Sequence, residues 1–114
     1  MDDKLHVVCL CAAWCGVCRD YRAVLDEMAT RFVGRAAFRW IDIEDEAELL
    51  GDIDVDNFPT LLIARDGRGL FFGTITPQPG TLERLVQGAL GGELAPVAAG
   101  PELDALLRRL RDDA

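Results

Sequence analysis

The feature that most constrains the fold is an apolar segment that runs directly into a pair of cysteines. Residues 5–11 read LHVVCLC, and apart from His6 both alternating sets of side chains are apolar. A strand with this pattern usually lies inside a sheet that is covered on both faces. Three residues later the motif CGVC begins, at residues 15–18. The cysteine pair is therefore expected where a central strand joins the next element of the chain.

That next element is predicted to be a helix that begins near Cys15 and stops near Gly34. Its apolar residues recur in steps of three and four, which places them on one stripe of a helix. The residues of this stripe are Cys18, Tyr21, Leu25, Met28 and Phe32. The charged residues between them fall off the stripe and can face water.

The rest of the chain alternates apolar segments with turn signals. Strands are predicted at residues 38–43, 60–64 and 70–75, and helices at 82–90 and 101–112. Pro77, Pro79 and Gly80 are expected to break the chain before the first of these helices. The order predicts an α/β fold with a mixed central sheet flanked by helices in three layers. We expect one domain at residues 1–92, followed by a linker and C-terminal helix at 93–114 that pack on this domain or extend it.

Composition narrows the class of protein. Half of the 114 residues are apolar, so the chain can bury a core without a disulfide framework. Twelve basic against 20 acidic residues give a net charge of −8, which argues against nucleic acid or a membrane as partner. No signal peptide is recognised at the acidic N-terminus, so a cytoplasmic protein is expected. Four cysteines in such a protein indicate catalysis or metal binding.

The position of the two cysteines at a helix start predicts different chemistry for each. Cys15 would face unpaired amides and the positive end of the helix dipole, so the pKa of its thiol is expected to fall. Cys18 lies one turn further on the core-facing stripe and should be more buried. Residues three apart on a helix are neighbours, so a disulfide can close between them. We therefore predict that Cys15 attacks a disulfide and that Cys18 resolves the mixed disulfide.

Together these motifs resemble the thioredoxin family. The segment WCGVC at residues 14–18 differs by one residue from the family's common WCGPC, and NFPT at 57–60 matches the loop before its third core strand. The turn at residues 66–67 and Gly73 at the end of the following strand fit as well, so the resemblance covers about residues 5–91. It implies a redox-active thiol–disulfide oxidoreductase acting in electron transport. Such an enzyme acts on protein disulfides or thiols, needs no metal or organic cofactor, and depends on an external electron donor or acceptor.

The resemblance also implies a substrate groove beside the cysteines. Pro59 would follow a cis peptide bond and lie against the Cys15/Cys18 pair, where it presents the backbone of Phe58 to an extended peptide. Phe58 can equally be a core aromatic residue. The complete set of substrate-binding residues implied in this way is Trp14, Gly16, Val17, Phe58, Pro59 and Gly73.

The chain departs from the family's pattern in four ways. Cys9 stands where the family usually has a buried Asp that helps to move the proton of the resolving cysteine, and Cys11 stands where an aromatic residue is common. Val17 replaces the proline of the motif, so the redox potential cannot be read from the sequence. We expect the leading strand and helix of the family to be absent and the helix at 101–112 to be extra. That helix would cover exposed apolar surface or dock a partner, which leaves a monomer or a weak dimer as expectations.

Three interpretations of the extra cysteines remain open. Cys9 and Cys11 point to the same strand face, and we favour two small buried apolar residues. Cys11 as a third redox thiol is the alternative. A metal site made by all four cysteines is disfavoured, because their spacing is not that of a zinc ribbon.

The alternative to an enzyme is a protein-binding or chaperone-like module with weak redox activity that uses the same groove. The missing buried Asp is the best support for this alternative.

Overall fold

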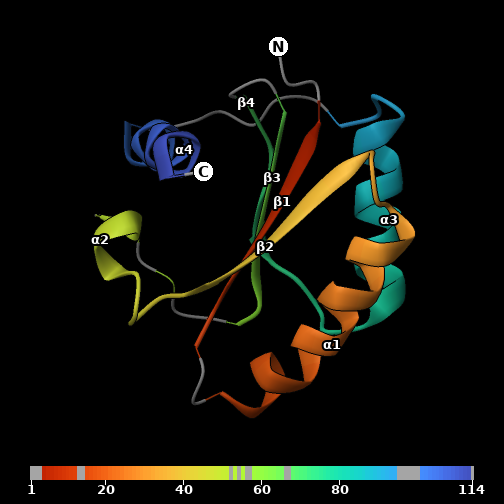
Figure 1. Cartoon of the computed structure of the whole chain (residues 1–114), viewed down its shortest axis with the longest axis horizontal. Coiled ribbons are helices and arrows are strands. Elements are labelled where there is room, and N and C mark those ends of the chain that lie inside the picture. Colours follow the sequence, from red (N-terminus) through yellow and green to blue (C-terminus); the bar gives the residue numbers. More distant parts are fainter. Residues whose placement is uncertain are drawn as a thin grey trace.

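The computed structural model describes residues 4–12, 15–51, 53, 55, 58–65, 68–94 and 101–113. Within these ranges a four-stranded sheet forms the centre of the molecule (Figure 1). Its strands are β1 (Leu5–Cys11), β2 (Ala36–Asp42), β3 (Thr60–Arg65) and β4 (Arg68–Thr74). The order across the sheet is β2-β1-β3-β4, with β1 parallel to β2 and antiparallel to β3, and with β3 antiparallel to β4.

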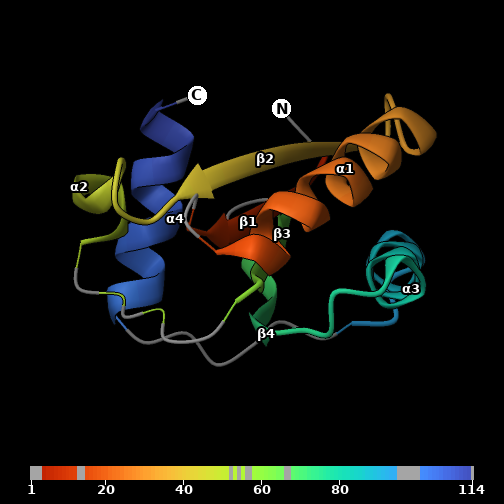
Figure 2. The same ribbon diagram turned by 90° about the horizontal axis from the view of Figure 1, so that it is seen from below.

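Helices cover both faces of the sheet, so the molecule has three layers (Figure 2). On one face lie α1 (Gly16–Arg31) and α3 (Pro79–Leu90). On the other face lie α2 (Ala47–Leu50) and α4 (Pro101–Asp113). The α/β fold with a mixed sheet between helical layers, including the C-terminal helix, is therefore confirmed.

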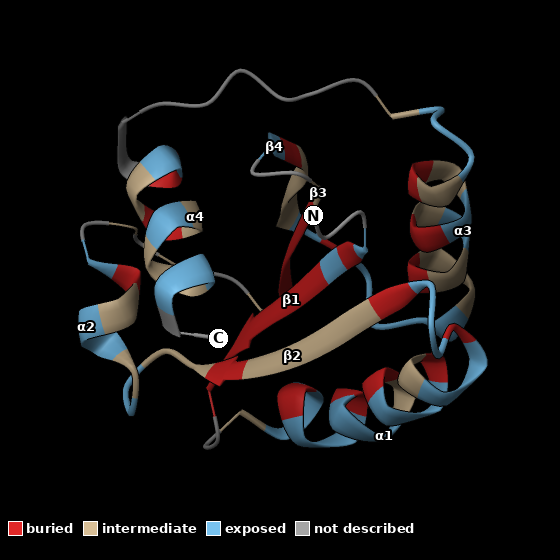
Figure 3. Ribbon diagram, turned by 45° about the horizontal axis from the view of Figure 1, so that its top comes forward, coloured by how far each residue is buried: buried red, intermediate tan, exposed pale blue. Residues whose placement is uncertain are grey.

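Strand β1 supplies both faces because successive side chains of a strand point in opposite directions. It is buried along almost its whole length (Figure 3). Leu5, Val7, Cys9 and Cys11 point toward α1 and α3, into what we call the first core. The other buried members of the first core are Cys18, Tyr21, Leu25, Met28, Phe32, Ala36, Leu61, Ile63, Ile75, Leu82, Val86 and Ala89.

The intervening side chains of β1 enter a second core beneath α2 and α4. Its buried members are Val8, Leu10, Ile41, Leu50, Leu62, Leu103 and Leu106. Leu106 is fully buried there, and Leu103 is 7% exposed. The leucine face of α4 therefore covers the sheet of its own chain.

Several element boundaries differ by a few residues from those predicted, and the starts of β2 and α3 are the most informative. Strand β2 begins at Ala36 because hydrogen-bonded pairing with β1 already starts at Leu5 opposite Ala36. Helix α3 begins at Pro79, which was expected to interrupt the chain. Proline is tolerated in the first helical turn, where its missing N–H would have no helical partner. None of the described helices has both the length and the apolar composition needed to cross a bilayer.

Candidate active site

Cys15 occupies the tight turn between β1 and α1. Its backbone N–H donates to the Ala12 carbonyl at 3.0 Å, and its own carbonyl accepts from the Arg19 N–H at 3.1 Å. This makes Cys15 the N-cap of α1, with an extended backbone at φ −83° and ψ 123°. Its side chain is partly exposed and packs against the first core. The thiol therefore lies at the positive end of the helix, within reach of solvent.

Within the described part of the chain, the start of α1 has neither a negative side chain nor a side-chain cap that would compete with a thiolate at Cys15 for the free backbone amides. The first turn of α1 carries no acidic side chain, and none of the described side chains caps the helix by a hydrogen bond. Gly16 and Val17 are exposed beside Cys15, and Val17 is 43% exposed. An incoming molecule would therefore meet free backbone amides and one apolar side chain next to the thiol.

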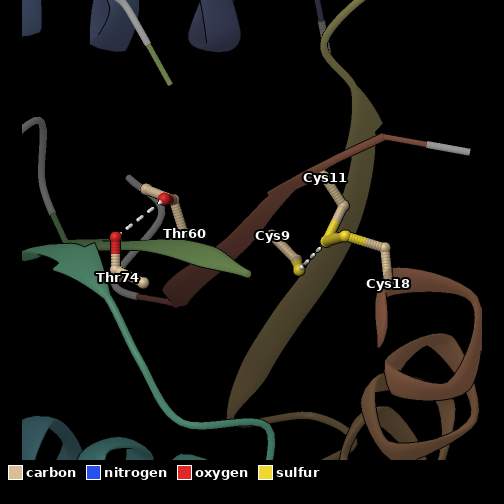
Figure 4. The surroundings of a disulfide bond; sticks show 5 residues. All are labelled: Cys9, Cys11, Cys18, Thr60 and Thr74. Carbon is tan, nitrogen blue, oxygen red and sulfur yellow. Dashed lines mark hydrogen bonds between the residues drawn. A yellow bond between two sulfur atoms is a disulfide. The ribbon is translucent and has the colours of Figure 1, made fainter. Parts of the chain in front are cut away.

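Cys18 is fully buried, as its place on the core-facing stripe predicts. It forms a disulfide with Cys11 at the end of β1 (Figure 4), and the two Cα atoms are 5.8 Å apart. The spacing of the motif predicts a disulfide between Cys18 and Cys15, whereas Cys15 is a free thiol here. The difference arises because the last residue of β1 and the first turn of α1 face the same core. Cys11 can therefore reach the same sulfur from the other side.

Cys9 lies next to this disulfide and has different properties. Its thiol donates a hydrogen bond to Cys11 Sγ at 3.7 Å (Figure 4). Cys9 is fully buried, and burial raises the pKa of its thiol from 9.0 to about 12. Cys9 therefore keeps its proton at neutral pH, which fits the interpretation as a small buried apolar residue. Cys11, in contrast, is bonded to Cys18.

Among the residues that the structure describes, no buried carboxylate replaces the Asp that the family usually has. Among the described residues, Thr60 is the one buried polar side chain outside the aromatic and sulfur-containing residues. The Tyr21 hydroxyl is buried and has no hydrogen-bond partner among the described residues. Burial first, and the neighbouring Cys9 second, raise the pKa of Tyr21. The buried side chains of Cys9 and Tyr21 are therefore both neutral at pH 7.

Phe58 and Pro59 immediately precede β3, and the pairing of β3 with β1 brings them near the cysteines. The Phe58–Pro59 peptide bond is cis. Thr60 pairs with Leu10, so the buried Pro59 comes beside the end of β1, next to Cys11. Half-buried Phe58 packs against the first core, which contains both bonded sulfurs.

The remaining predicted groove residues are less closely tied to the site. Gly73 is half-buried on β4 and pairs with Leu61. Neighbouring Thr74 contacts Thr60 through hydroxyl oxygens 3.4 Å apart (Figure 4). Trp14 lies outside the described residues, so its predicted place beside the nucleophile stays a prediction.

The described residues contain no group of three or more His, Cys, Asp or Glu side chains arranged to hold a metal ion. The disulfide also removes Cys11 and Cys18 as thiolate ligands in this form.

Comparison with known proteins identifies the family. The sequence model of the thioredoxin family matches residues 1–86. The chain belongs to the thioredoxin family. Members of this family are typically thiol–disulfide oxidoreductases, and their partners are protein thiols and disulfides.

Individual thioredoxins show the extent of the similarity. Thioredoxin 2 of Chlorobaculum tepidum is 30% identical over 67 residues, which is 59% of this chain and 62% of that protein. A thioredoxin of Staphylococcus aureus is 28% identical over 68 residues, or 60% of this chain and 65% of the relative. The chain thus spans less than two thirds of the length of these curated relatives.

Solved thioredoxin structures share the fold. The germline-specific thioredoxin Deadhead of Drosophila melanogaster superimposes with a TM-score of 0.68 at 27% identity, covering 75% of this chain and 81% of that one. Thioredoxin of Trypanosoma brucei brucei gives a TM-score of 0.68 at 28% identity, covering 79% and 78%. The thioredoxin-like fold predicted from the sequence is therefore confirmed.

Proposed function

We propose that this protein is a thiol–disulfide oxidoreductase that exchanges electrons with protein disulfides through Cys15 and Cys18. The observation that carries this proposal is the unequal exposure of the four cysteines. Cys15 is partly exposed at the start of α1, whereas Cys9, Cys11 and Cys18 are fully buried. A disulfide on another protein can therefore reach the Cys15 sulfur first.

The reaction starts from the reduced protein. The Cys15 thiolate attacks one sulfur of the substrate disulfide, so a Cys15–substrate bond forms and the other substrate sulfur leaves as a thiolate. The positive end of the α1 dipole stabilises the attacking negative sulfur. Cys18 then attacks Cys15 Sγ, which forms a Cys15–Cys18 disulfide and releases the second substrate thiol. Two electrons pass to the substrate, and an external dithiol returns them.

The proton of Cys18 needs an acceptor during the second step. Because the first core holds no carboxylate among its described residues, the substrate thiolate released in the first step is the nearest base that the reaction itself supplies. Resolution is therefore expected to be the slow step, and the mixed disulfide should persist longer than in a protein with a buried Asp.

The substrate groove would lie between the start of α1 and the loop before β3. Gly16 and Val17 lie on one side of Cys15, and the register brings Pro59 and Phe58 to the neighbouring end of β1. Exposed Val17 offers an apolar contact for an extended peptide. Trp14 and Gly73 complete the groove in this proposal.

The test is reduction of insulin disulfides with dithiothreitol as electron donor. We expect turnover by the natural protein, and Cys15→Ser should lower it by about 100-fold or more because the attacking sulfur is lost. Cys18→Ser should lower turnover as well, whereas Cys9→Ala should retain it. Turnover by Cys15→Ser at the natural rate would contradict the proposal. Insulin binding without any turnover by the natural protein would instead favour the protein-binding module.

A further inference from the structure

We propose that Cys11 is a third redox-active cysteine, and that Cys18 is exchanged between Cys15 and Cys11 inside the protein. This inference rests on the proposed function and extends it. In this proposal the oxidised protein carries the buried Cys11–Cys18 disulfide, and Cys15 remains a free thiol.

The three sulfurs meet at one junction. Cys11 ends β1, Cys15 caps α1, and Cys18 is in the first turn of α1. Cys18 lies within bonding distance of Cys11, to which it is joined, and three residues after Cys15 along the helix. Residues with that spacing are neighbours on a helix. Cys18 is therefore the one cysteine that both others can reach.

The exchange conserves electrons. In a Cys15–Cys18 disulfide, the Cys11 sulfur attacks Cys18 Sγ, so the Cys11–Cys18 bond forms and the Cys15–Cys18 bond breaks. Cys15 leaves as a thiolate, and the proton given up by Cys11 ends on Cys15 or in solvent. The reverse step begins with attack of the Cys15 thiolate on Cys18 Sγ. No external oxidant or reductant takes part in either direction.

The environment of each sulfur favours the Cys11–Cys18 form. Both of its sulfurs are removed from water in the first core, while the released Cys15 lies at the positive end of a helix. Cys9 lies two residues further back along β1, and its thiol contacts Cys11 Sγ at 3.7 Å and stays outside the disulfide. The buried disulfide is also closed to external thiols, so electrons must enter through Cys15.

The first experiment locates the disulfide in the oxidised full-length protein. After oxidation with diamide, accessible thiols are alkylated with iodoacetamide under native conditions, and the remaining thiols are blocked with N-ethylmaleimide after unfolding. Trypsin would leave all four cysteines in one peptide, whereas chymotrypsin cleaves after Leu10 and Trp14 and separates Cys9, Cys11 and the Cys15/Cys18 pair. Mass spectrometry then identifies each linkage.

We expect the natural protein to carry an alkylated Cys15 and a Cys11–Cys18 link between two peptides. Cys11→Ala should instead give a Cys15–Cys18 loop within one peptide and no alkylation of Cys15. Cys9→Ala is the matched control, because it removes the neighbouring buried thiol, and it should behave like the natural protein. A natural protein with only the Cys15–Cys18 loop and a blocked Cys11 would overturn the inference.

The second experiment measures the route of electrons and does not depend on the folding of a core variant. Cys15→Ser changes a partly exposed residue, and prolonged treatment with diamide, which acts during local opening of the first core, should still form the Cys11–Cys18 disulfide. Reduction of that disulfide by dithiothreitol should be at least about 10-fold slower than in the natural protein, because direct attack requires local opening of the first core. Equal reduction rates in Cys15→Ser and the natural protein would overturn the claim that electrons enter through Cys15.

The insulin assay separates this inference from the proposed function. Insulin turnover together with a Cys15–Cys18 link in every oxidised sample would reject the role of Cys11 and leave the oxidoreductase standing. The Cys11–Cys18 link with Cys15-dependent reduction, but without insulin turnover, would support the internal exchange and reject the proposed activity on proteins.

Discussion

The two faces of the sheet are both apolar, but sulfur occurs on only one of them among the described core residues. The first core contains Cys9, Cys11, Cys18 and the unpartnered hydroxyl of Tyr21. The second core contains only aliphatic side chains among its fully or nearly buried members, and the leucines of α4 close it. Both cores take alternate residues of the same strand, β1. The alternating side chains of one regular strand therefore place the cysteines on one face of the sheet and buried aliphatic residues on the other.

Substitutions on the two faces of the sheet are therefore expected to affect different measured quantities. A change in the second core should alter the free energy of unfolding and leave the cysteine chemistry intact. A change around the sulfurs should alter the chemistry or its pH dependence.

The largest expected effect is on stability and comes from the second core. Leu106→Ala removes a fully buried side chain of α4 and should lower the free energy of unfolding by about 2–5 kcal/mol. Urea denaturation measures this loss. The rate of Cys15 alkylation in urea-free buffer should stay within twofold of the natural rate. A large change in that rate would break the proposed separation of the two faces.

The next effect is a loss of stability at alkaline pH that originates in the first core. The pKa of Cys9 is about 12 in the folded protein against 9.0 ordinarily, so the unfolded chain loses this proton first as the pH rises. The stabilising contribution is complete below pH 9. It falls by about 1.4 kcal/mol per pH unit until the folded protein also loses the proton near pH 12.

Urea denaturation between pH 7 and 11 measures this slope. Cys9→Ala should flatten it, whereas Leu106→Ala should lower the whole curve and keep the slope. The raised pKa of Tyr21 acts in the same direction, so some slope should remain in Cys9→Ala. An unchanged slope in Cys9→Ala would show that the buried thiol is not its source.

A smaller effect concerns how α4 is attached to α2. Arg109 donates from Nε to the Leu49 carbonyl at 2.5 Å and from a terminal nitrogen to the Leu50 carbonyl at 2.8 Å. These carbonyls lie at the end of α2, where neither has a partner within the helix, and the Leu50 carbonyl also accepts from the Ile53 N–H at 3.3 Å. Arg109→Met should therefore cost about 1–2 kcal/mol in urea denaturation. Arg108→Met is the matched control on the exposed side of α4, and an equal loss there would refute the capping role.

The smallest effect on stability is expected on the exposed surface of α1 and α3. Arg31 of α1 forms an ion pair with Glu83 of α3, and both side chains are substantially exposed. Exposed ion pairs contribute little because water and salt screen them. Glu83→Gln should cost about 0.5 kcal/mol or less and should leave insulin turnover unchanged. A loss above 2 kcal/mol would mean that this pair, and not the first core, holds the two helices together.

The sequence predicts most of the fold because its main elements have clear periodicities. The continuous apolar run of β1 identifies a strand that is covered on both faces, and the three- and four-residue steps in α1 identify a helix and its buried face. The resemblance to thioredoxins adds the cis bond before Pro59, which base rates alone would not favour. The sequence does not determine which face α4 covers, because an amphipathic pattern does not specify the apolar surface that it meets.

The pairing of the cysteines could not be predicted for a similar reason. The spacing of Cys15 and Cys18 is a local signal on one helix, and it indicates a disulfide between them. The approach of Cys11 to Cys18 depends on how α1 packs against the end of β1, which is a tertiary feature. The shared strand face of Cys9 and Cys11 was the available signal. The catalytic roles of Cys15 and Cys18 stay predictions.

The most direct test of the account is the identity of the cysteine that first bonds to a substrate. Reduced Cys18→Ser protein is mixed with insulin, quenched with acid, and analysed by mass spectrometry after chymotryptic cleavage. We predict one covalent adduct, formed between an insulin sulfur and Cys15. An adduct at Cys9 or Cys11, or no adduct under conditions where the natural protein reduces insulin, would contradict the claim that Cys15 is the entrance to the sulfur-containing face.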